Sequence, residues 1–292
     1  MKKITLVFLP ILISACAGGG SSSSGGSAST NAFTSWSATI SANTPVSFTG
    51  GSTSVMALDG TSAQTDSDGT ATLALGGNGI FSSISASTPT SSASFSAANG
   101  DTLQSGFYQT STIALNKAET TIGVFTNPTY YGFEYQTYGA WGAYGNATSS
   151  GSAISVGSVT PVTGMPATGS YTFTGGASGY YTDANKLAYV TNASMTATAS
   201  FDSRTVNFNT TGTSLAGSPS GTPVAASNLN LVGTLSIAAG ANNLAGTVTT
   251  VSGMSGNANG KFYGPTANEV GGTYAVSGSG LGTFVGGFGG KR

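Results

Sequence analysis

Histidine is absent from this chain of 292 residues, and charged side chains make up only 6% of it. Without histidine, the chain lacks the most common general base and metal ligand and the side chain that titrates near neutral pH. Its basic residues are few and scattered, which argues against a nucleic-acid site built on a basic patch. There is also no nucleophile motif, and the one closely spaced pair of carboxylates, Asp66 and Asp68, is followed by Gly69 and is more typical of a turn between strands. We therefore predict a protein that is not an enzyme, needs no cofactor and binds no nucleic acid.

Cysteine is almost as scarce, because Cys16 is the only one. It follows a basic start and an apolar run, 4–13, that is too short to span a bilayer and is typical of a secretory signal peptide. The letters ISAC that end at Cys16 resemble the bacterial lipobox, which implies cleavage before the cysteine and a lipid on its thiol. The alternative is an ordinary secretory signal with an incidental cysteine. We predict a signal peptide over 1–15 and a lipid anchor at Cys16.

The next segment, 16–30, consists almost entirely of Gly, Ser and Ala after the cysteine. Chains of this composition behave as flexible coils, so the segment is predicted to tether a folded body to a membrane. Ala17 follows the cysteine where an inner-membrane retention signal would have Asp. We therefore predict a lipid-anchored protein of the outer membrane, exposed at the cell surface.

Long helical patterns are also lacking, whereas strand-like patterns are frequent. Twelve Tyr and fourteen Phe can fill a core, and 45 Gly punctuate the chain. In the run 194–201, Met, Ala and Phe alternate with Thr and Ser, and 229–237 places Leu and Ile on one face. Such runs at short, regular intervals predict an antiparallel meander closed into a barrel, which leaves no open sheet edge to aggregate.

One segment, 130–144, holds seven aromatic residues in the sequence YYGFEYQTYGAWGAY. These rings could form the core and edge of a hairpin. They could also line a recognition surface, because Tyr and Trp suit sites that are apolar on one side and wet on the other. The residues predicted to bind a ligand are Tyr130, Tyr131, Tyr135, Tyr138 and Trp141.

The C-terminal part carries a more specific pattern. GKFYGPTANEVGGTY, 260–274, is followed by FVGGFGGKR at the end of the chain. This resembles the end of the β-barrel in the transferrin-binding protein B family, where F-Y-G-P runs through a turn with an acid into G-G-T-F/Y. On this resemblance Phe262 points into the barrel and Tyr263 points outward. Glu269 is expected in the turn, where it accepts backbone N–H bonds.

The resemblance also implies a fold and a division of the chain. We predict an all-β protein in which a C-terminal eight-stranded antiparallel β-barrel follows a smaller β-rich handle domain. The handle is expected at 31–164 and the barrel at 165–292. Unlike the large transferrin binders of the family, this chain has one barrel and few charges.

Members of the family are surface lipoproteins that capture molecules such as iron-loaded transferrin, haem or haemoglobin. The resemblance therefore implies a non-catalytic monomer that binds an iron carrier, haem, or a host or environmental protein. In a chain without histidine, haem would need Tyr or Met as axial ligand. The tyrosines considered for this role are Tyr130, Tyr131, Tyr135, Tyr138, Tyr180 and Tyr181.

Two other readings stay open. The chain, poor in charge and rich in Ser, Thr, Gly and Ala, could be a structural or adhesive surface protein without a small-molecule ligand. It could also be a barrel inserted in the outer membrane. The second reading requires an apolar band facing lipid, whereas the outward positions of the predicted strands are mostly Thr, Ser and Asn.

Overall fold

The computed structural model of the chain describes residues 46–55, 64–76, 79–145 and 151–292. The predicted signal peptide, the tether and Cys16 lie outside these residues. Within the described ranges, no helix is both long enough and apolar enough to cross a membrane.

The described chain consists almost entirely of β-strands. The N-terminal strands are β1 (Val46–Val55), β2 (Gln64–Leu75), β3 (Phe81–Thr88), β4 (Ser91–Ser96), β5 (Thr102–Gly106), β6 (Ser111–Leu115), β7 (Thr121–Thr126), β8 (Gln136–Ala143) and β9 (Ser152–Gly157). The C-terminal strands are β10 (Ser170–Thr182), β11 (Ala188–Ser200), β12 (Thr205–Ala216), β13 (Val224–Ala225), β14 (Leu231–Ile237), β15 (Leu244–Thr250), β16 (Ser255–Tyr263), β17 (Glu269–Gly278) and β18 (Gly282–Lys291). The helical elements are η1 (Ala97–Asn99), η2 (Phe107–Gln109), α2 (Pro128–Tyr131), η3 (Val162–Gly164) and η4 (Ser227–Leu229).

The C-terminal strands form the predicted barrel. They pair antiparallel in the order β11-β10-β18-β17-β16-β15-β14-β12, and a further pairing between β11 and β12 closes the ring. The short strand β13 adds to β12 outside this ring. The prediction of an eight-stranded antiparallel barrel is therefore confirmed.

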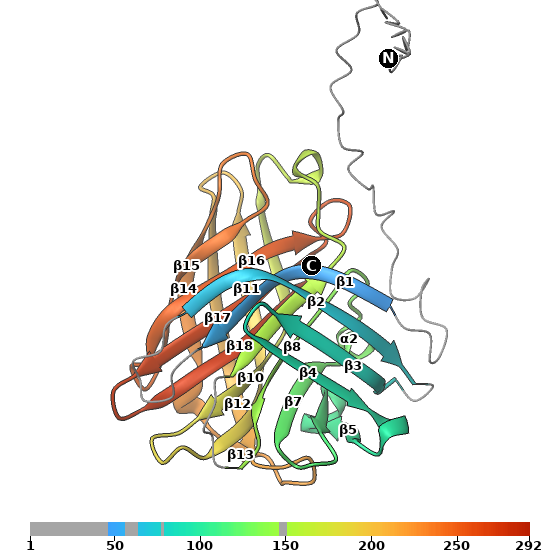
Figure 1. The fold of residues 1–292 in the computed structure, drawn as a ribbon. Helices are drawn as coiled ribbons and strands as arrows, with labels where there is room; N and C mark the ends of the chain where they lie inside the picture. The colour runs from blue at the N-terminus through green and yellow to red at the C-terminus, as the bar shows by residue number, and fades with distance from the viewer. Residues whose placement is uncertain (1–45, 56–63, 77–78, 146–150) are drawn as a thin grey trace, which may run out of the picture. The chain divides into compact units, whose positions relative to one another are not determined.

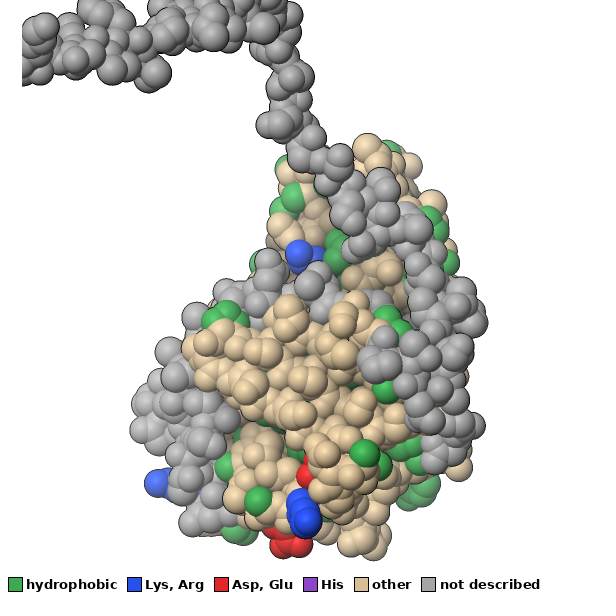
Figure 2. Space-filling view, turned by 45° about the vertical axis from the view of Figure 1, so that its right-hand side comes forward, with side chains coloured by type: hydrophobic (Ala, Val, Ile, Leu, Met, Phe, Trp, Pro, Cys, Tyr) green, Lys and Arg blue, Asp and Glu red, His purple; other side chains and the backbone are tan. Residues whose placement is uncertain are grey.

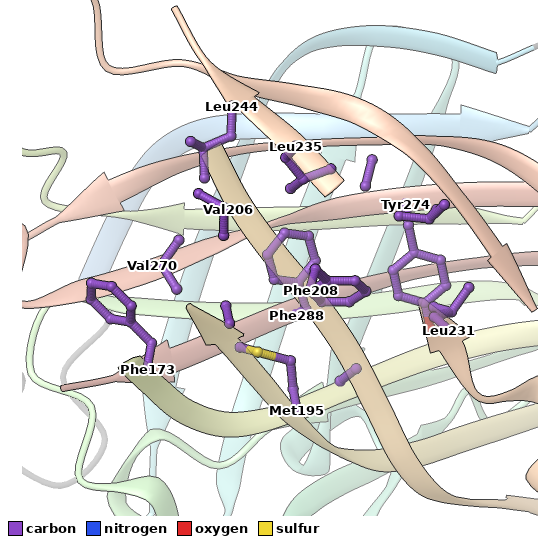
Figure 3. Packing of buried hydrophobic residues seen from close by; sticks show 14 of the residues in the cluster. Phe173, Met195, Val206, Phe208, Leu231, Leu235, Leu244, Val270, Tyr274 and Phe288 are labelled. Carbon is purple, nitrogen blue, oxygen red and sulfur yellow. The ribbon is translucent and has the colours of Figure 1, made fainter. Parts of the chain in front are cut away.

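Apolar side chains fill the inside of the barrel (Figure 3). Met195, Ala197 and Ala199 of β11 are buried as their alternation predicts, and Phe262 of β16 is completely buried beside them. Burying a Phe or Leu side chain contributes about 1.5–3 kcal/mol to stability. The barrel is thus a packed core, and Phe262 points into it as expected.

The N-terminal strands form one sheet, called here the N-terminal sheet, in the order β4-β3-β2-β1-β9-β8-β7-β6-β5. Its two halves face one another across an apolar cluster. Phe125 of β7 stacks on Trp141 of β8, and the Trp141 indole N–H donates to the Ser91 hydroxyl of β4 at 3.0 Å. The sheet therefore folds over on itself into a sandwich.

The N-terminal sheet also packs against the barrel strands β10, β17 and β18, called here the barrel wall, mainly through β1, β7, β8 and β9 (Figure 1). Tyr180 of β10 is buried in this contact, and its hydroxyl donates to the Ala143 carbonyl at 3.0 Å. Beside it, the Ser178 hydroxyl shares hydrogen bonds with Ser111 and Thr126 of the sheet. The contact thus combines apolar packing with satisfied polar groups.

Glycines make this contact unusually close. A Cβ at Gly289 of β18 would lie 2.5 Å from the Gln136 side-chain nitrogen and 2.7 Å from the Tyr138 ring, and one at Gly271 of β17 would collide with the Gln136 side chain. Side chains of β8 therefore rest directly on the backbone of the barrel wall. Glycine is required at these positions because only a residue without a side chain allows such a close approach.

Two further expectations for that motif need qualification. Tyr263 faces outward from the barrel as predicted, yet it is completely buried, because the N-terminal sheet covers it and Ser155 bonds its hydroxyl at 3.0 Å. Glu269 does not lie in the turn but begins β17. It accepts its backbone N–H bonds from residues more than 130 positions away, because the fold brings the N-terminal sheet against this strand end.

Gly289→Ala is expected to lower the free energy of unfolding by about 1–3 kcal/mol, because the added methyl group meets Gln136 and Tyr138, both buried. Chemical denaturation would measure the change. The control is Gly217→Ala, where the nearest heavy atom to a new Cβ is 3.8 Å away, and its effect should stay below about 1 kcal/mol. Equal effects of the two substitutions would contradict the close contact.

Candidate functional site

The tyrosine-rich segment begins with the single turn of helix α2. Asn127 caps this turn, because its side-chain oxygen accepts the N–H of Thr129 at 3.1 Å, and Pro128 occupies the first helical position. Both choices favour a helix start. Gly132 ends the turn with a φ of +63°, a conformation that glycine adopts without strain. The aromatic segment, for which a hairpin was one of two alternatives, therefore starts as a helical turn and enters a strand only at β8.

Four aromatic rings of this segment form a column that runs from the surface to the interior. Tyr130 and Tyr131 have ring centroids 5.0 Å apart, Tyr131 and Phe133 are 5.3 Å apart, and Phe133 and Tyr138 are 6.3 Å apart. Tyr130 is 53% exposed, whereas Phe133 and Tyr138 are buried between the N-terminal sheet and the barrel. Packing along the column fixes the orientation of the exposed ring.

The five residues predicted to bind a ligand differ in how far they are exposed to solvent. Tyr130 is exposed, and Tyr131 and Tyr135 are partly buried. Tyr138 and Trp141 are each only 1% exposed and lie on opposite faces of β8, so they pack in two different cores. The structure thus exposes Tyr130, leaves Tyr131 and Tyr135 partly accessible, and places the other two in the interior.

A further exposed tyrosine lies beside this helical turn. Tyr108 is 87% exposed at the centre of η2, between β5 and β6. It is flanked by Phe107 and Gln109, and all three have positive φ values of 47°, 58° and 76°. Three successive non-glycine residues in this region are strained, and such strain often marks functional positions. The sequence GFYQT contains no pattern that predicts this turn.

Asn127 connects the two tyrosine-bearing turns. In addition to capping α2, its side-chain N–H donates to the Gln109 carbonyl at 3.4 Å, and its backbone N–H donates to the Thr110 carbonyl at 3.0 Å. The turns therefore lie side by side at one end of strands β5 to β8 of the N-terminal sheet. We call the exposed rings of Tyr108 and Tyr130, with the partly exposed Tyr131, the tyrosine surface.

Two charged residues of the barrel hold the segment that follows α2. The Glu269 carboxylate accepts the backbone N–H of Glu134 at 2.6 Å and that of Tyr135 at 3.2 Å. The Lys291 ammonium donates to the Gly132 carbonyl at 2.7 Å. Charge-assisted bonds of this kind are roughly twice as strong as neutral ones. The base of the tyrosine surface is therefore fastened to the barrel wall.

Burial changes the acidity of the groups around this site. It raises the pKa of the Glu269 carboxyl to about 7, and the two N–H donors and Lys291 offset only part of this rise. Burial likewise raises the pKa of the Tyr131 hydroxyl to about 12, with the neighbouring Tyr130 adding to the effect. Tyr131 is therefore neutral at physiological pH, whereas Glu269 titrates within the physiological range.

The exposed rings lie among polar, uncharged side chains. Within the described part of the chain, no group of three His, Cys, Asp or Glu residues could hold a metal ion. The side chains around the exposed rings are neutral hydroxyls and amides, among them Gln109, Thr110 and Thr129. Exposed tyrosines amid neutral polar groups can anchor a partner through apolar area and hydrogen bonds.

Comparison with known families identifies the type of barrel. Residues 165–292 match the family described as the C-lobe and N-lobe beta barrels of Tf-binding protein B. The C-terminal part is therefore a barrel of the transferrin-binding protein B type, as the sequence motif predicted. No curated protein sequence matches the chain.

Solved structures of transferrin-binding protein B are similar to this chain at low sequence identity. A transferrin-binding protein B variant from Haemophilus parasuis Hp5 is 15% identical with a TM-score of 0.47, over 85% of this chain and 45% of that one. An intact transferrin-binding protein B with N and C lobes is 16% identical with a TM-score of 0.44, over 84% of this chain and 46% of that one. The isotype 1 transferrin-binding protein B from serogroup B Neisseria meningitidis is 12% identical with a TM-score of 0.38. The match covers 86% of this chain and 76% of that one. The chain thus spans less than half the length of the first two.

Asn127→Ala is expected to lower the free energy of unfolding by about 1–2 kcal/mol, because it removes the cap of α2 and the side-chain bond to η2. Amide exchange should rise at 107–110 and 128–132 and remain unchanged in the barrel strands. Asn185→Ala, in the exposed turn between β10 and β11, is the matched control. Unchanged exchange in both turns would show that Asn127 does not hold them together.

Proposed function

We propose that this chain is a lipid-anchored protein of the outer-membrane surface that captures a protein ligand through the tyrosine surface, without catalysis. The observation that carries the proposal is the pair of exposed tyrosines, Tyr108 and Tyr130, on two turns fixed by one asparagine. Tyrosines held rigidly at a surface lose little conformational entropy on binding and are frequent among interface residues that dominate affinity.

The family match supports a protein as the ligand. Its barrel is that of a protein named for binding transferrin, so iron-carrying host proteins are the first ligands to test. Few charges are present on the face shown in Figure 2, where uncharged side chains and backbone prevail. A partner is therefore expected to be held mainly by apolar and neutral polar contacts rather than by electrostatic steering.

Haem is retained as the second ligand to test. A tyrosine that ligates ferric haem does so as phenolate, and the raised pKa of Tyr131 makes that form costly. Tyr138 and Tyr180 are also buried. These features favour a protein ligand over haem.

The proposal includes the anchor and the organisation of the chain. It places a signal peptide at 1–15, a lipid on Cys16, a tether over 16–30, a handle domain at 31–164 and the barrel at 165–292, in a monomer. A tethered body is favoured over a barrel inserted in the membrane because the inside of this barrel is filled with apolar side chains. Inserted barrels have the opposite pattern, with polar residues inside and apolar residues outside.

The protein without its signal peptide, residues 17–292, should bind one of the iron-loaded host proteins transferrin, lactoferrin or haemoglobin saturably in a surface plasmon resonance measurement. Tyr108→Ala and Tyr130→Ala should each weaken this binding by about tenfold or more, because each removes a large exposed anchor. Val251→Ala is the control, since Val251 is 70% exposed in the turn between β15 and β16.

Equal affinity in the tyrosine variants and the control would exclude the tyrosine surface as the binding site. A saturable shift of the Soret band on haem titration, lost in Tyr130→Phe, would replace the protein ligand by haem. Self-assembly or cell adhesion without saturable binding would favour the structural or adhesive alternative.

Cys16→Ser should abolish incorporation of labelled palmitate and release the protein from the membrane fraction of cells, because a serine hydroxyl cannot replace the thiol that carries the lipid. The wild-type protein should remain in the outer-membrane fraction. It should also be cleaved by protease that is added to whole cells. Continued membrane association of Cys16→Ser would contradict the lipid anchor.

A further inference from the structure

We propose that Glu269 is a positioning residue that makes the docking of residues 132–135, and with it the placement of the tyrosine surface, depend on pH. The use of this coupling in ligand capture rests on the proposed function. The docking itself involves only residues of this chain.

The geometry of the contact singles out one carboxylate. Glu269 is completely buried at the first residue of β17, and both of its oxygens accept backbone N–H groups, one from Glu134 and one from Tyr135. These donors belong to the segment that connects α2 to β8. The same segment covers the carboxylate, so its departure would remove both donors and admit water.

A second bond attaches the same segment to the next strand of the barrel. The Lys291 ammonium at the end of β18 donates to the carbonyl of Gly132, the residue that ends α2. Gly132 follows directly after the Tyr130–Tyr131 pair. Movement of residues 132–135 away from the barrel would therefore displace the aromatic column and its exposed end.

Among the residues that the structure describes, the ionisable groups that face Glu269 come from three elements. Lys291 of β18 favours the charged carboxylate, whereas Glu134 of the docked segment opposes it. Tyr263 of β16 also faces Glu269, and burial keeps this tyrosine neutral by raising its pKa to about 12. Strands β8 and β9 present the uncharged side chains of Gln136 and Ser155 near this part of the wall.

The sign of the coupling follows from burial. The docked carboxyl has a pKa of about 7, above its ordinary value of 4.5, because desolvation outweighs the favourable bonds. Once the segment leaves, the carboxyl is hydrated and its pKa falls toward the ordinary value. The docked state therefore binds the proton more tightly. Docking is strongest below about pH 4.5 and weakens as the pH rises through about 7.

Selective labelling can test this directly, because the chain contains only three glutamates, Glu119, Glu134 and Glu269. With ¹³C at the glutamate carboxyls, nuclear magnetic resonance should show Glu269 titrating near pH 7. Lys291→Met should move this midpoint upward, since it removes the facing cation. Glu134→Gln should move it downward by removing a like charge.

Amide exchange measures the docking itself. After correction for the intrinsic rate, the opening of the Glu134 and Tyr135 amides should increase at least tenfold between about pH 5 and pH 8, since each unit of pKa difference corresponds to a factor of ten. Glu269→Gln should abolish this dependence. Glu119→Gln, which alters an exposed glutamate in the β6–β7 turn, should retain it.

A Glu269 midpoint below about pH 5, or an equal pH dependence in Glu269→Gln and the wild type, would overturn the proposal. If Glu269→Gln does not fold, the absence of an upward midpoint shift in Lys291→Met would do the same. None of these measurements uses a ligand. A result that overturns the role of Glu269 is therefore distinct from a result that overturns the proposed function, which is tested by the Tyr108 and Tyr130 variants.

Discussion

The direct packing of the N-terminal sheet on the backbone of the barrel wall is the contact on which the other features depend. Glycines such as Gly271 and Gly289 remove the side chains that would otherwise separate the two layers. Gln136 and Tyr138 occupy the space thus created, and they set the position of β8 relative to the barrel. The start of β8 in turn determines where α2 and its tyrosines emerge. The high glycine content is therefore a requirement of close contact between two sheets and not only a source of turns.

The barrel was accessible to sequence reasoning because strands away from the barrel wall, such as β12, β14 and β15, have one buried face, and the alternation along the strand reports that face locally. The run that contains Met195 and Ala197 is an example, as is Phe262 in the C-terminal motif. The site was less accessible. Strand β8 is buried on both faces, so its pattern could not distinguish the buried Tyr138 and Trp141 from surface residues. The partners of Glu269 could not be predicted either, because they are 134 and 135 positions away in the sequence.

The scarcity of charge gives the remaining ionisable groups more influence. Glu269 and Lys291 lie at the ends of adjacent barrel strands and bind the same short segment of the N-terminal sheet. A buried carboxylate is an expensive way to hold a loop, since neutral groups could form hydrogen bonds with less desolvation, whereas Lys291 is exposed. The buried carboxylate is understandable if, as proposed above, its protonation controls how firmly this segment is held. The tyrosine surface and the charged anchor beneath it are thus linked by direct contacts into one structural unit.

The glycine-lined contact also restricts how this protein can change during evolution. At the glycines of the barrel wall, almost any substitution adds atoms where another backbone or a buried ring already lies. Accepted changes there must therefore be rare, or be compensated by changes in the N-terminal sheet. The turn that carries Tyr108 has no comparable restriction on its exposed side chain, which is 87% accessible. Lineages under pressure to alter their exposed face can therefore substitute residues in the exposed turns and keep the same contact between the N-terminal sheet and the barrel wall. Sequence divergence should concentrate where a partner or an antibody would touch the molecule, and a common architecture would persist beneath it.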